Sequence, residues 1–544
     1  MGTTSDGGRD RKIVSGQSQD GQMLGLDRRH FLRSAALGGG LLAVPGLIAA
    51  CSGSSDSPSN QPSGKKPIYG GNLRVAMVGG TVTTLDPGLA VAEIESARAT
   101  NLYDRLVNLN PDMSLQMCLA ESMEPNATAT VWTARLRPGV RWHDGSPFTA
   151  DDVIFSFKRM GAPKSVLFGA SVMALVDLNG LTKMDSLTVR IPLKKPISEF
   201  PVLFTPPQMQ ITKAGETNFQ HPIGTGPFKY VSFTPGQQSV FARNPHYWQP
   251  GRPYVDQLTL IDTSDPTARL NALLDSQVDA MDQLSYPQAK VQQSAGNIRV
   301  LAAQGSNIVP IYMATDMAPF TDVRVRQAMR LIAGRPQLIE TAQDGMGVVG
   351  NDLYGRGLPD YDTHIPQREQ DIGQAKSLLK AAGMSDLTIT LFSSTAAPGM
   401  LESATAFAQQ ARAAGVTINV NNGPAGSYFG TQYLKQNFAQ TQWLTAPIYQ
   451  WIGQAMAPTA PFNETHWHNP QWDSLLAQAE ATIDTGKRQE IYYEMQQLLW
   501  NEGGYLIWGF YPLLDGLSLN VQGAIPNPAN ELGNWQFQTW WLSS

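Results

Sequence analysis

The stretch "LTITLFSSTAAPGMLESATAFAQQARAAGVTINV", Leu387–Val420, decides the fold class of this chain. The residues 387–394 alternate in the manner of a strand, and the alanine-rich segment after them predicts a helix that stops at Gly415. The segment "VTINV" that follows predicts a second strand. Two strands joined by a helix favour a parallel pair with a right-handed crossover. This part of the chain is therefore predicted to be α/β.

The segments before residue 310 have a different pattern. Alternating apolar residues in "YGGNLRVAMVGG", 69–80, predict a strand. The segment "VWTARLRPGVRWHDGSPFTADDVIFSFKRM", 131–160, predicts a strand, two turns and a helix that begins with a capping box from Thr149 to Asp152. The chain thus begins with strand-rich mixed structure and becomes α/β, which predicts at least two lobes.

Two further helices are predicted from their first residues. Asp265 precedes a proline and an apolar helical pattern, which is typical of an N-cap. In "FTDVRVRQAMRLIAG", 320–334, Thr321 is the expected N-cap, and Asp322 lies one turn before Arg326.

Composition limits the class of protein. The 544 residues are 42% hydrophobic and 16% charged, which suits two or three packed lobes. No segment after residue 50 is apolar enough to span a bilayer, which excludes a channel or a permease. Residues 51–544 hold 34 basic and 41 acidic side chains, a net charge of −7. An acidic body without basic clusters argues against nucleic acid and anionic lipid as partners.

The N-terminus "DRRHFLRSAALGGGLLAVPGLIAACSGSS", 27–55, resembles an export signal. The arginine pair 28–29 precedes a short apolar run, as in twin-arginine (Tat) signals. "LIAAC" resembles a lipobox, so Cys51 is predicted to carry the lipid anchor. Residues 1–50 would then be the signal peptide, and the Ser/Pro/Gly-rich residues 51–67 a flexible tether. The competing interpretation is a chance apolar terminus with a structural cysteine.

No catalytic residue, metal or cofactor is expected. The chain has no nucleophile elbow, zinc-protease motif, phosphate loop or dinucleotide fingerprint. His466 and His468 form the one close histidine pair, and a loop position is favoured over a metal site. The adjacent acids Asp151 and Asp152 are better explained by helix capping than by catalysis. Cys118 is expected to be a buried or half-buried thiol.

Aromatic residues are dense between Tyr428 and Trp472, where proline and glycine indicate loops. Aromatic side chains on loops can wall a binding cleft, although about half of these are expected in the core. The polar candidates on such a wall are Gln442, Thr445, Gln450 and Gln454.

The chain resembles the family 5 extracellular solute-binding proteins of ATP-binding cassette (ABC) importers, the group of the oligopeptide- and dipeptide-binding proteins. The opening "GGNLRVA…LDP" fits this family, and the resemblance extends from about residue 68 to the C-terminus. Four segments carry it: "LRPGVRWHDGSPFTADDVIFSFKR" (136–159), "HPIGTGPFKYVSFTPGQQSVFARNPHYW" (221–248), "PFTDVRVRQAMRLIAGR" (319–335) and "NPQWDSLLAQAEATIDTGKRQEIYYEMQQLLW" (469–500).

The resemblance implies a two-lobed α/β periplasmic-binding-protein fold of type II, similar to cluster C. Lobe I would comprise 68–310 and 505–544, with a subdomain inserted at about 106–204, and lobe II would comprise 311–504. The lobes would close on a small solute, a peptide or a related molecule, and deliver it to an ABC permease and ATPase complex. The protein would be a monomer, held by its lipid anchor in the periplasm or at the extracytoplasmic face of the membrane.

The resemblance also implies cleft residues. One group follows the first strand, from Gly79 to Thr83, and includes Gly80, Thr81, Val82 and Thr83. The other group lies in lobe II, in and near "QTQWLTAPIYQW": Tyr428, Trp443, Thr445, Ala446, Tyr449 and Trp451.

The chain departs from the family's pattern at one position. Peptide binders place an aspartate three residues after the tryptophan that matches Trp443, where it pairs with the peptide amine. Here that position is Ala446. A buried ammonium without a counter-charge is costly, so either another acid replaces the aspartate or the solute lacks a free amine there. An opine, an oligosaccharide or an aromatic compound is therefore an alternative solute, and an anchored enzyme or a sensory receptor is an alternative function.

Overall fold

The computed structural model describes residues 66–80 and 83–543, which belong to one compact unit, Asn60–Ser544. The twin-arginine signal, Cys51 and all but the last two residues of the tether lie outside the described residues, as do Thr81 and Val82. Within the described ranges, no helix is both long and apolar enough to span a bilayer.

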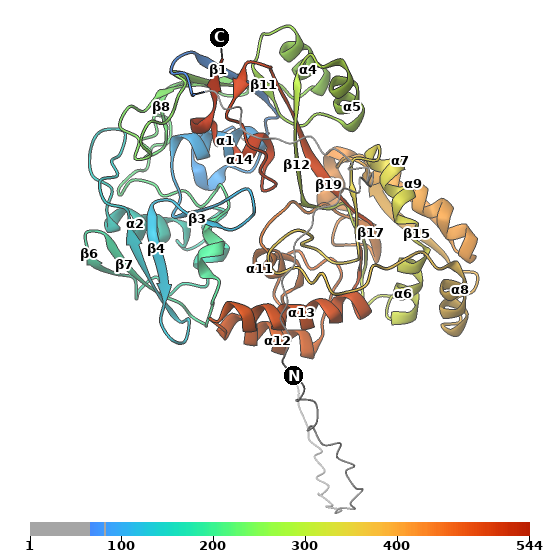
Figure 1. Ribbon diagram of the computed structural model, residues 1–544. Helices are drawn as coiled ribbons and strands as arrows, with labels where there is room; N and C mark the ends of the chain where they lie inside the picture. The colour runs from blue at the N-terminus through green and yellow to red at the C-terminus, as the bar shows by residue number, and fades with distance from the viewer. Residues whose placement is uncertain (1–65, 81–82, 544) are drawn as a thin grey trace, which may run out of the picture. The chain divides into compact units, whose positions relative to one another are not determined.

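An eight-stranded sheet forms the first structural layer (Figure 1). Strand β1 is central because Leu73, Val75 and Met77 are all fully buried, as their alternation predicts. It pairs parallel to β10 and β11, while β19 pairs antiparallel to both β11 and β12. Along the sheet the strands are β12 (Arg299–Asn307), β19 (Gly509–Leu517), β11 (Ala280–Met281), β1 (Asn72–Met77), β10 (Gln257–Asp262), β9 (Gln238–Arg243) and β8 (Phe228–Thr234), with β14 (Val348–Val349) paired to β19.

A four-stranded antiparallel sheet lies within the part of the chain between β1 and β8. Its strands are β4 (Ala120–Pro125), β5 (Val131–Leu136), β7 (Thr188–Pro192) and β6 (Thr182–Asp185). Helix α2 (Ala150–Met160) packs beside it, and α3 (Ala170–Met173) follows. The predicted capping box is confirmed, since the Asp152 carboxylate accepts from Thr149 N at 2.8 Å.

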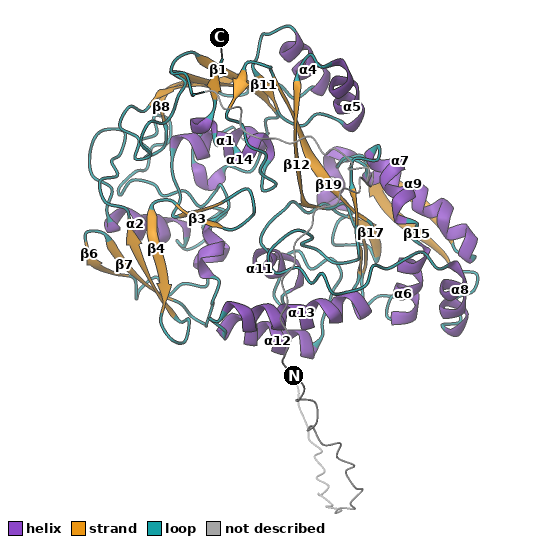
Figure 2. Ribbon diagram, in the orientation of Figure 1, coloured by secondary structure: helices purple, strands orange, loops and turns teal. Residues whose placement is uncertain are grey.

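A five-stranded sheet contains the predicted strand–helix–strand unit. Strands β15 and β16 are parallel, with Ile389 opposite Ile418, and α9 connects them and packs on both. Helices α6 to α9 lie beside β15 (Figure 2). In order the strands are β16 (Thr417–Gly423), β15 (Thr388–Ser394), β17 (Phe438–Gln440), β13 (Ile311–Met313) and β18 (Tyr505–Leu506); the helices are α6 (Val323–Ile332), α7 (Arg335–Gln343), α8 (Ile372–Ala381) and α9 (Met400–Ala411).

The remaining elements connect or flank these sheets. Helices α12 and α13 pack against each other, and Ser198 of the segment after the four-stranded sheet donates to the Glu480 carbonyl of α12 at 2.8 Å. These elements are α1 (Glu93–Leu102), α4 (Pro266–Leu274), α5 (Tyr286–Ala295), α10 (Tyr428–Thr431), α11 (Ile448–Trp451), α12 (Pro470–Ala481), α13 (Thr485–Glu502), α14 (Glu531–Asn534), and the strand pairs β2 (Val107–Leu109) with β3 (Leu115–Met117) and β20 (Val521–Gln522) with β21 (Trp541–Leu542).

Two short segments connect the eight-stranded and five-stranded sheets. The chain leaves β12 and enters β13 through residues 308–310, and it leaves β18 and enters β19 through residues 507–508. Figure 1 shows β12 and β19 running side by side toward β17. The family resemblance implies hinge strands near "IVPIYMATD" (308–316) and "YLIWGFYP" (505–512), which include these segments. The chain has a mixed α/β fold with two lobes.

The predicted start of helix α6 is wrong by one residue. Asp322, not Thr321, is the N-cap, and its carboxylate accepts from Arg324 N at 2.9 Å. The expected pairing of Asp322 with Arg326 is also absent from the described contacts, because the Arg326 guanidinium donates to the carbonyls of Phe320 and Glu502. Asp265 caps α4 as predicted, with Ala268 N at 2.7 Å.

Candidate solute-binding cleft

A cavity of about 340 Å³ lies where the chain crosses between the two sheets. One wall is the segment from Gln442 to Gln454, and Phe462 adds to it. The opposite wall comes from distant parts of the chain: Val91, Glu93, Ser96, Leu109, Phe168, residues 205–208, Ala529, Asn530 and Trp535. The two walls thus belong to the parts of the chain that carry different sheets.

Trp443 is held in place at both its backbone and its ring. Its N–H and carbonyl pair with Ile308 at 3.0 and 2.9 Å, at the crossing segment. Its indole N–H donates to Glu464 Oε1 at 2.7 Å, and Tyr433 OH donates to the other carboxylate oxygen at 3.1 Å. Glu464 is fully buried, and burial raises the pKa of its carboxyl to about 7. Glu464 is therefore a positioning residue for the tryptophan.

The loop after Trp443 is fixed by the crossing strand. Asn307 Oδ1 accepts from Thr445 N at 2.8 Å, and Thr445 Oγ1 accepts from Ser306 N at 2.8 Å. The hydroxyl of Tyr354 accepts from Ala446 N and donates to the Leu444 carbonyl, both at 2.7 Å. These bonds pair backbone N–H and C=O groups of a loop that is not part of a β-sheet.

Trp451 begins a polar and aromatic corner of the same wall. Its ring stacks on Tyr354 at 4.6 Å between centroids, and its buried indole N–H has no partner among the described residues. Gln450 next to it accepts from Thr205 Oγ1 of the opposite wall at 3.3 Å. The cavity therefore joins aromatic surface with a few polar groups, as ligand sites commonly do.

The structure brings four of the predicted lobe II residues together: Trp443, Thr445, Ala446 and Trp451 line the cavity, as do Gln442, Gln450 and Gln454. Two tyrosines lie elsewhere. Tyr428 is fully buried, with its hydroxyl bonded to the carbonyls of Phe392 and Gln440, and Tyr449 OH donates to Glu480 of α12. Both tyrosine rings are buried and their hydroxyls bond other parts of the chain, so neither ring lines the cavity.

The loop after β1 lies beside this region without lining it. Gly80 and Thr83 are half-buried and are not part of the described cavity walls, whereas Val78 lines the neighbouring cavity. At Gly79 an added Cβ would lie 2.2 Å from the Asp262 carboxylate, so a larger residue here would have to displace that side chain.

A larger cavity of about 740 Å³ adjoins the first, and Gln442 and Leu444 line both. Gln442 Nε2 donates to Tyr511 OH of β19 at 2.6 Å at this junction. The ionisable residues that line the two cavities are Glu93, Arg269, Asp344, Glu402 and Glu531, with the phenols of Tyr286 and Tyr511. No local sequence pattern predicts that these ionisable residues lie together, since they are spread along the chain from Glu93 to Glu531.

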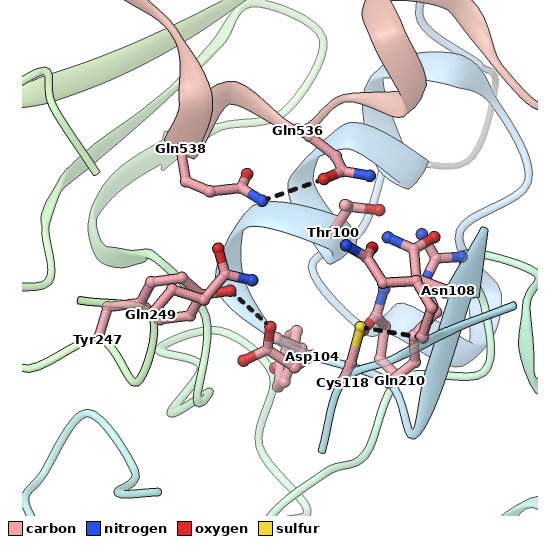
Figure 3. Close-up of a pocket in the computed structure, with 12 residues that line it drawn as sticks. Thr100, Asp104, Asn108, Cys118, Gln210, Tyr247, Gln249, Gln536 and Gln538 are labelled. Carbon is pink, nitrogen blue, oxygen red and sulfur yellow. Dashed lines mark hydrogen bonds between the residues drawn. The ribbon is translucent and has the colours of Figure 1, made fainter. Parts of the chain in front are cut away.

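Two other places are not suited to a solute. A polar chamber of about 20 Å³ lies beneath α1, with Asp104, Cys118, Gln210 and Tyr247 pointing into it (Figure 3). Its volume suits a single water. Burial raises the pKa of the Cys118 thiol to about 12, which makes it an unreactive group and confirms the predicted buried cysteine.

The histidine pair does not form a metal centre with its neighbours. His466 Nδ1 lies 2.7 Å from the Asp316 carboxylate, and His468 is an exposed residue 3.8 Å from Asp473. In the described ranges no group of three His, Cys, Asp or Glu side chains is placed to hold a metal ion.

Comparison with known proteins agrees with this architecture. The chain is 28% identical over 484 residues to the glutathione-binding protein GsiB of Pectobacterium atrosepticum, which covers 84% of this chain and 92% of that protein. HbpA2 from Haemophilus parasuis superposes with a TM-score of 0.76 at 21% identity, over 87% of this chain and 100% of that one. The periplasmic binding protein DppA from Helicobacter pylori, solved with the peptide STSA, gives 0.73 at 20% identity, over 88% and 99%.

The family model of the bacterial extracellular solute-binding proteins, family 5, matches residues 114–472, which is more than half of the chain. That match includes the four-stranded sheet, the crossing strand β12 and the aromatic wall of the cleft. The chain belongs to the bacterial extracellular solute-binding proteins of family 5.

Proposed function

We propose that the chain is the solute receptor of an ABC importer, which captures a peptide or peptide-like solute in the cleft and delivers it to a membrane permease. The observation that carries this proposal is the pair of adjoining cavities at the crossing strands, walled from both sides. Solute contacts with both walls favour the closed arrangement over the open one, because only the closed arrangement makes both sets of contacts. Family membership and the relatives named glutathione-binding proteins support a peptide-like solute.

Several finer assignments belong to the same proposal. Lobe I comprises 68–310 and 505–544 with the insertion at about 106–204, and lobe II comprises 311–504. Most strands of the three sheets follow these ranges, but β18 (505–506) lies in the five-stranded sheet and β14 (348–349) pairs with β19 of the eight-stranded sheet. The protein is exported by the Tat route and anchored through lipidated Cys51 outside the cytoplasmic membrane. The cleft binds solute with Trp443, Thr445, Ala446 and Trp451.

The test is a solute screen on the purified protein. Native mass spectrometry identifies any molecule that co-purifies, and thermal shifts are then measured with peptides, sugars and opines. A specific solute stabilises the folded state by RT ln(1 + [L]/Kd), about 2.7 kcal/mol at 100 times Kd. Turnover of a bound solute would contradict the receptor function and favour an enzyme. A strong shift with opines and none with peptides would establish the non-peptide alternative, which the solved relative AgaA in complex with agropinic acid supports.

A further inference from the structure

The acidic residues of the cleft meet at the junction of its two cavities. Glu93 is the first residue of α1 and lines the smaller cavity, while Glu531 is the first residue of α14 and lines the larger one. Their carboxyls lie within hydrogen-bonding reach of each other. Asp515 of β19 and Asp282 stand behind them, close enough to raise the pKa of Glu93. Four carboxyl groups are therefore gathered on one wall.

Positive charge on this wall is scarce. Arg269 is its one lining cation among the described residues, and it lies 3.2 Å from Asp282. The same guanidinium donates to the carbonyls of Thr263 and Ser264 at 2.7 and 3.0 Å. Asp515 accepts from the backbone N–H groups of Gln283 and Leu532, which leaves no cation for it.

Glu531 is the acidic residue whose hydrogen bonding is least complete: no N–H group of a described residue donates to its buried Oε2, and the Glu93 carboxyl is within reach of it. Its side chain is 5% exposed, it lines the larger cavity, and its buried Oε2 accepts no hydrogen bond from the described residues. The hydroxyl of Tyr286, which lines the same cavity, is also buried and unpartnered. Native proteins satisfy nearly all buried polar atoms, so an unpartnered carboxylate oxygen at a cavity wall indicates a missing donor.

The opposite wall of the larger cavity is acidic as well. Half-buried Asp344 ends α7, and exposed Glu402 lies in the first turn of α9. Neither forms an ion pair with a described residue. The lining of the two cavities thus holds four acidic side chains and, among the described residues, a single guanidinium, which is already engaged.

We infer that the natural solute carries an ammonium or guanidinium group, which binds at the junction of the cavities against Glu531 and Glu93. This inference rests on the proposed function and names the chemistry of its solute. The cation supplies donors to Glu531 and, unlike a neutral donor, also offsets the negative charge of the acidic lining. Closure then brings Asp344 and Glu402 toward the same positive charge. Glutathione has one ammonium but two carboxylates, which the acidic lining repels, so we expect it to bind more weakly than a solute without carboxylates.

The test compares matched probes by calorimetric titration of the purified protein. The probes are trialanine amide, with a free α-amine; N-acetyl-Ala-Arg-Ala amide, with a cation in the side chain alone; N-acetyl-trialanine amide, which is neutral; and glutathione. We expect at least one cationic probe to bind at least tenfold more tightly than the neutral probe and glutathione. Which of the two binds shows whether the cation is a terminal amine or a basic side chain.

Glu→Gln substitutions test which acidic side chains bind the cation of the solute. Glu531→Gln keeps size and shape, and it should weaken the cationic probe at least tenfold while leaving the neutral probe within twofold. Glu93→Gln is the second variant, so that a folding defect in one does not decide the result. Glu490→Gln, on an exposed position of α13, is the matched control and should change nothing.

Three results would overturn the inference. These are the neutral probe binding as tightly as both cationic probes, an unchanged cationic affinity in both Gln variants, or binding of calcium chloride without binding of either organic cation. The proposed function fails differently: a broad screen would then give no stabilising solute of any charge, and no co-purified molecule would appear in native mass spectra.

Discussion

The two walls of the cleft differ in chemistry and in how the chain builds them. The aromatic wall comes from one contiguous segment, 442–454, which the crossing strand pins through Ile308 and Asn307. The acidic wall is assembled from the start of α1, the strand β19 and the start of α14, which are more than 400 residues apart at the extremes. An aromatic surface contributes contact area to many solutes, whereas a cluster of carboxyls selects by charge. Under the proposed function, we expect the first wall to provide affinity and the second to provide selection.

The largest expected effect comes from the aromatic wall. Trp443→Ala removes the ring that faces the cavity and leaves buried Glu464 without its closest donor. We expect solute affinity to fall about 30-fold or more, the loss typical of a hot-spot residue, and the free energy of unfolding to fall by about 2–4 kcal/mol. Titration calorimetry and chemical denaturation measure the two quantities.

Trp500→Ala is the matched control for this change. Trp500 is also half-buried and also donates its indole N–H, to Asn351 Oδ1 at 3.2 Å, but it lies outside the cleft. It should destabilise the protein without changing solute affinity. Equal losses of affinity in the two variants would show that Trp443 acts through stability alone.

The second effect is a dependence of stability on pH, to which both walls contribute. Burial raises the pKa of Glu464 behind the aromatic wall, of Asp282 behind the acidic wall and of Glu199 beside α13, each to about 7. Each pKa exceeds the value of about 4 in an unfolded chain, so the folded state holds more protons between these values. The stability from these groups is complete below about pH 4 and is lost as the pH rises through 7.

The measurement is best made between pH 6.5 and 8. Burial lowers the pKa of His143 to about 4, and this group has the opposite sign below its unfolded value near 6.5. Above pH 6.5 the carboxyls dominate, and we expect a loss of about 1 kcal/mol for each of the three, seen as a fall of a few °C in Tm. Glu464→Gln should reduce the fall by about a third. A Tm that rises across this range would contradict the burial of these groups.

The aromatic wall was partly predictable because its members are close together in the sequence. Aromatic density and loop-forming residues indicated Trp443 and Trp451, and the family resemblance placed Thr445 and Ala446. The same density misplaced Tyr428 and Tyr449, since a ring on a loop and a ring in a core look alike in one sequence. Only the tertiary partners of their hydroxyls distinguish the two cases.

The acidic wall was not predictable from the sequence. Glu93 and Glu531 look like ordinary acidic residues at helix starts, where the helix dipole explains them. Their proximity depends on how β19 and α14 return to the first sheet, which no local pattern reports. The strand–helix–strand unit at 387–420, in contrast, depends on local periodicity and was predicted correctly.

The third effect is smaller and concerns how the aromatic wall is held. Tyr354→Phe keeps the ring stacked on Trp451 and removes the hydroxyl that bonds Ala446 N and the Leu444 carbonyl. We expect a loss of about 1 kcal/mol in the free energy of unfolding, because two part-buried backbone groups lose their partner, with a several-fold loss of affinity. Tyr361→Phe, at a half-buried tyrosine whose hydroxyl does not bond the described residues of this loop, is the control and should change neither quantity.

The smallest effect tests which wall holds the charge of the solute. Ala446→Asp restores the acid that peptide-binding relatives have at this position, on the half-buried aromatic wall. If Glu531 and Glu93 already bind the cation, the new carboxylate should improve the affinity for trialanine amide by no more than about threefold, since partly exposed ion pairs contribute only about 0–1 kcal/mol. Ala446→Asn controls for the added volume. A gain above tenfold that persists when Glu531 is replaced by Gln would place the amine at the aromatic wall, and the division of roles between the two walls would then be wrong.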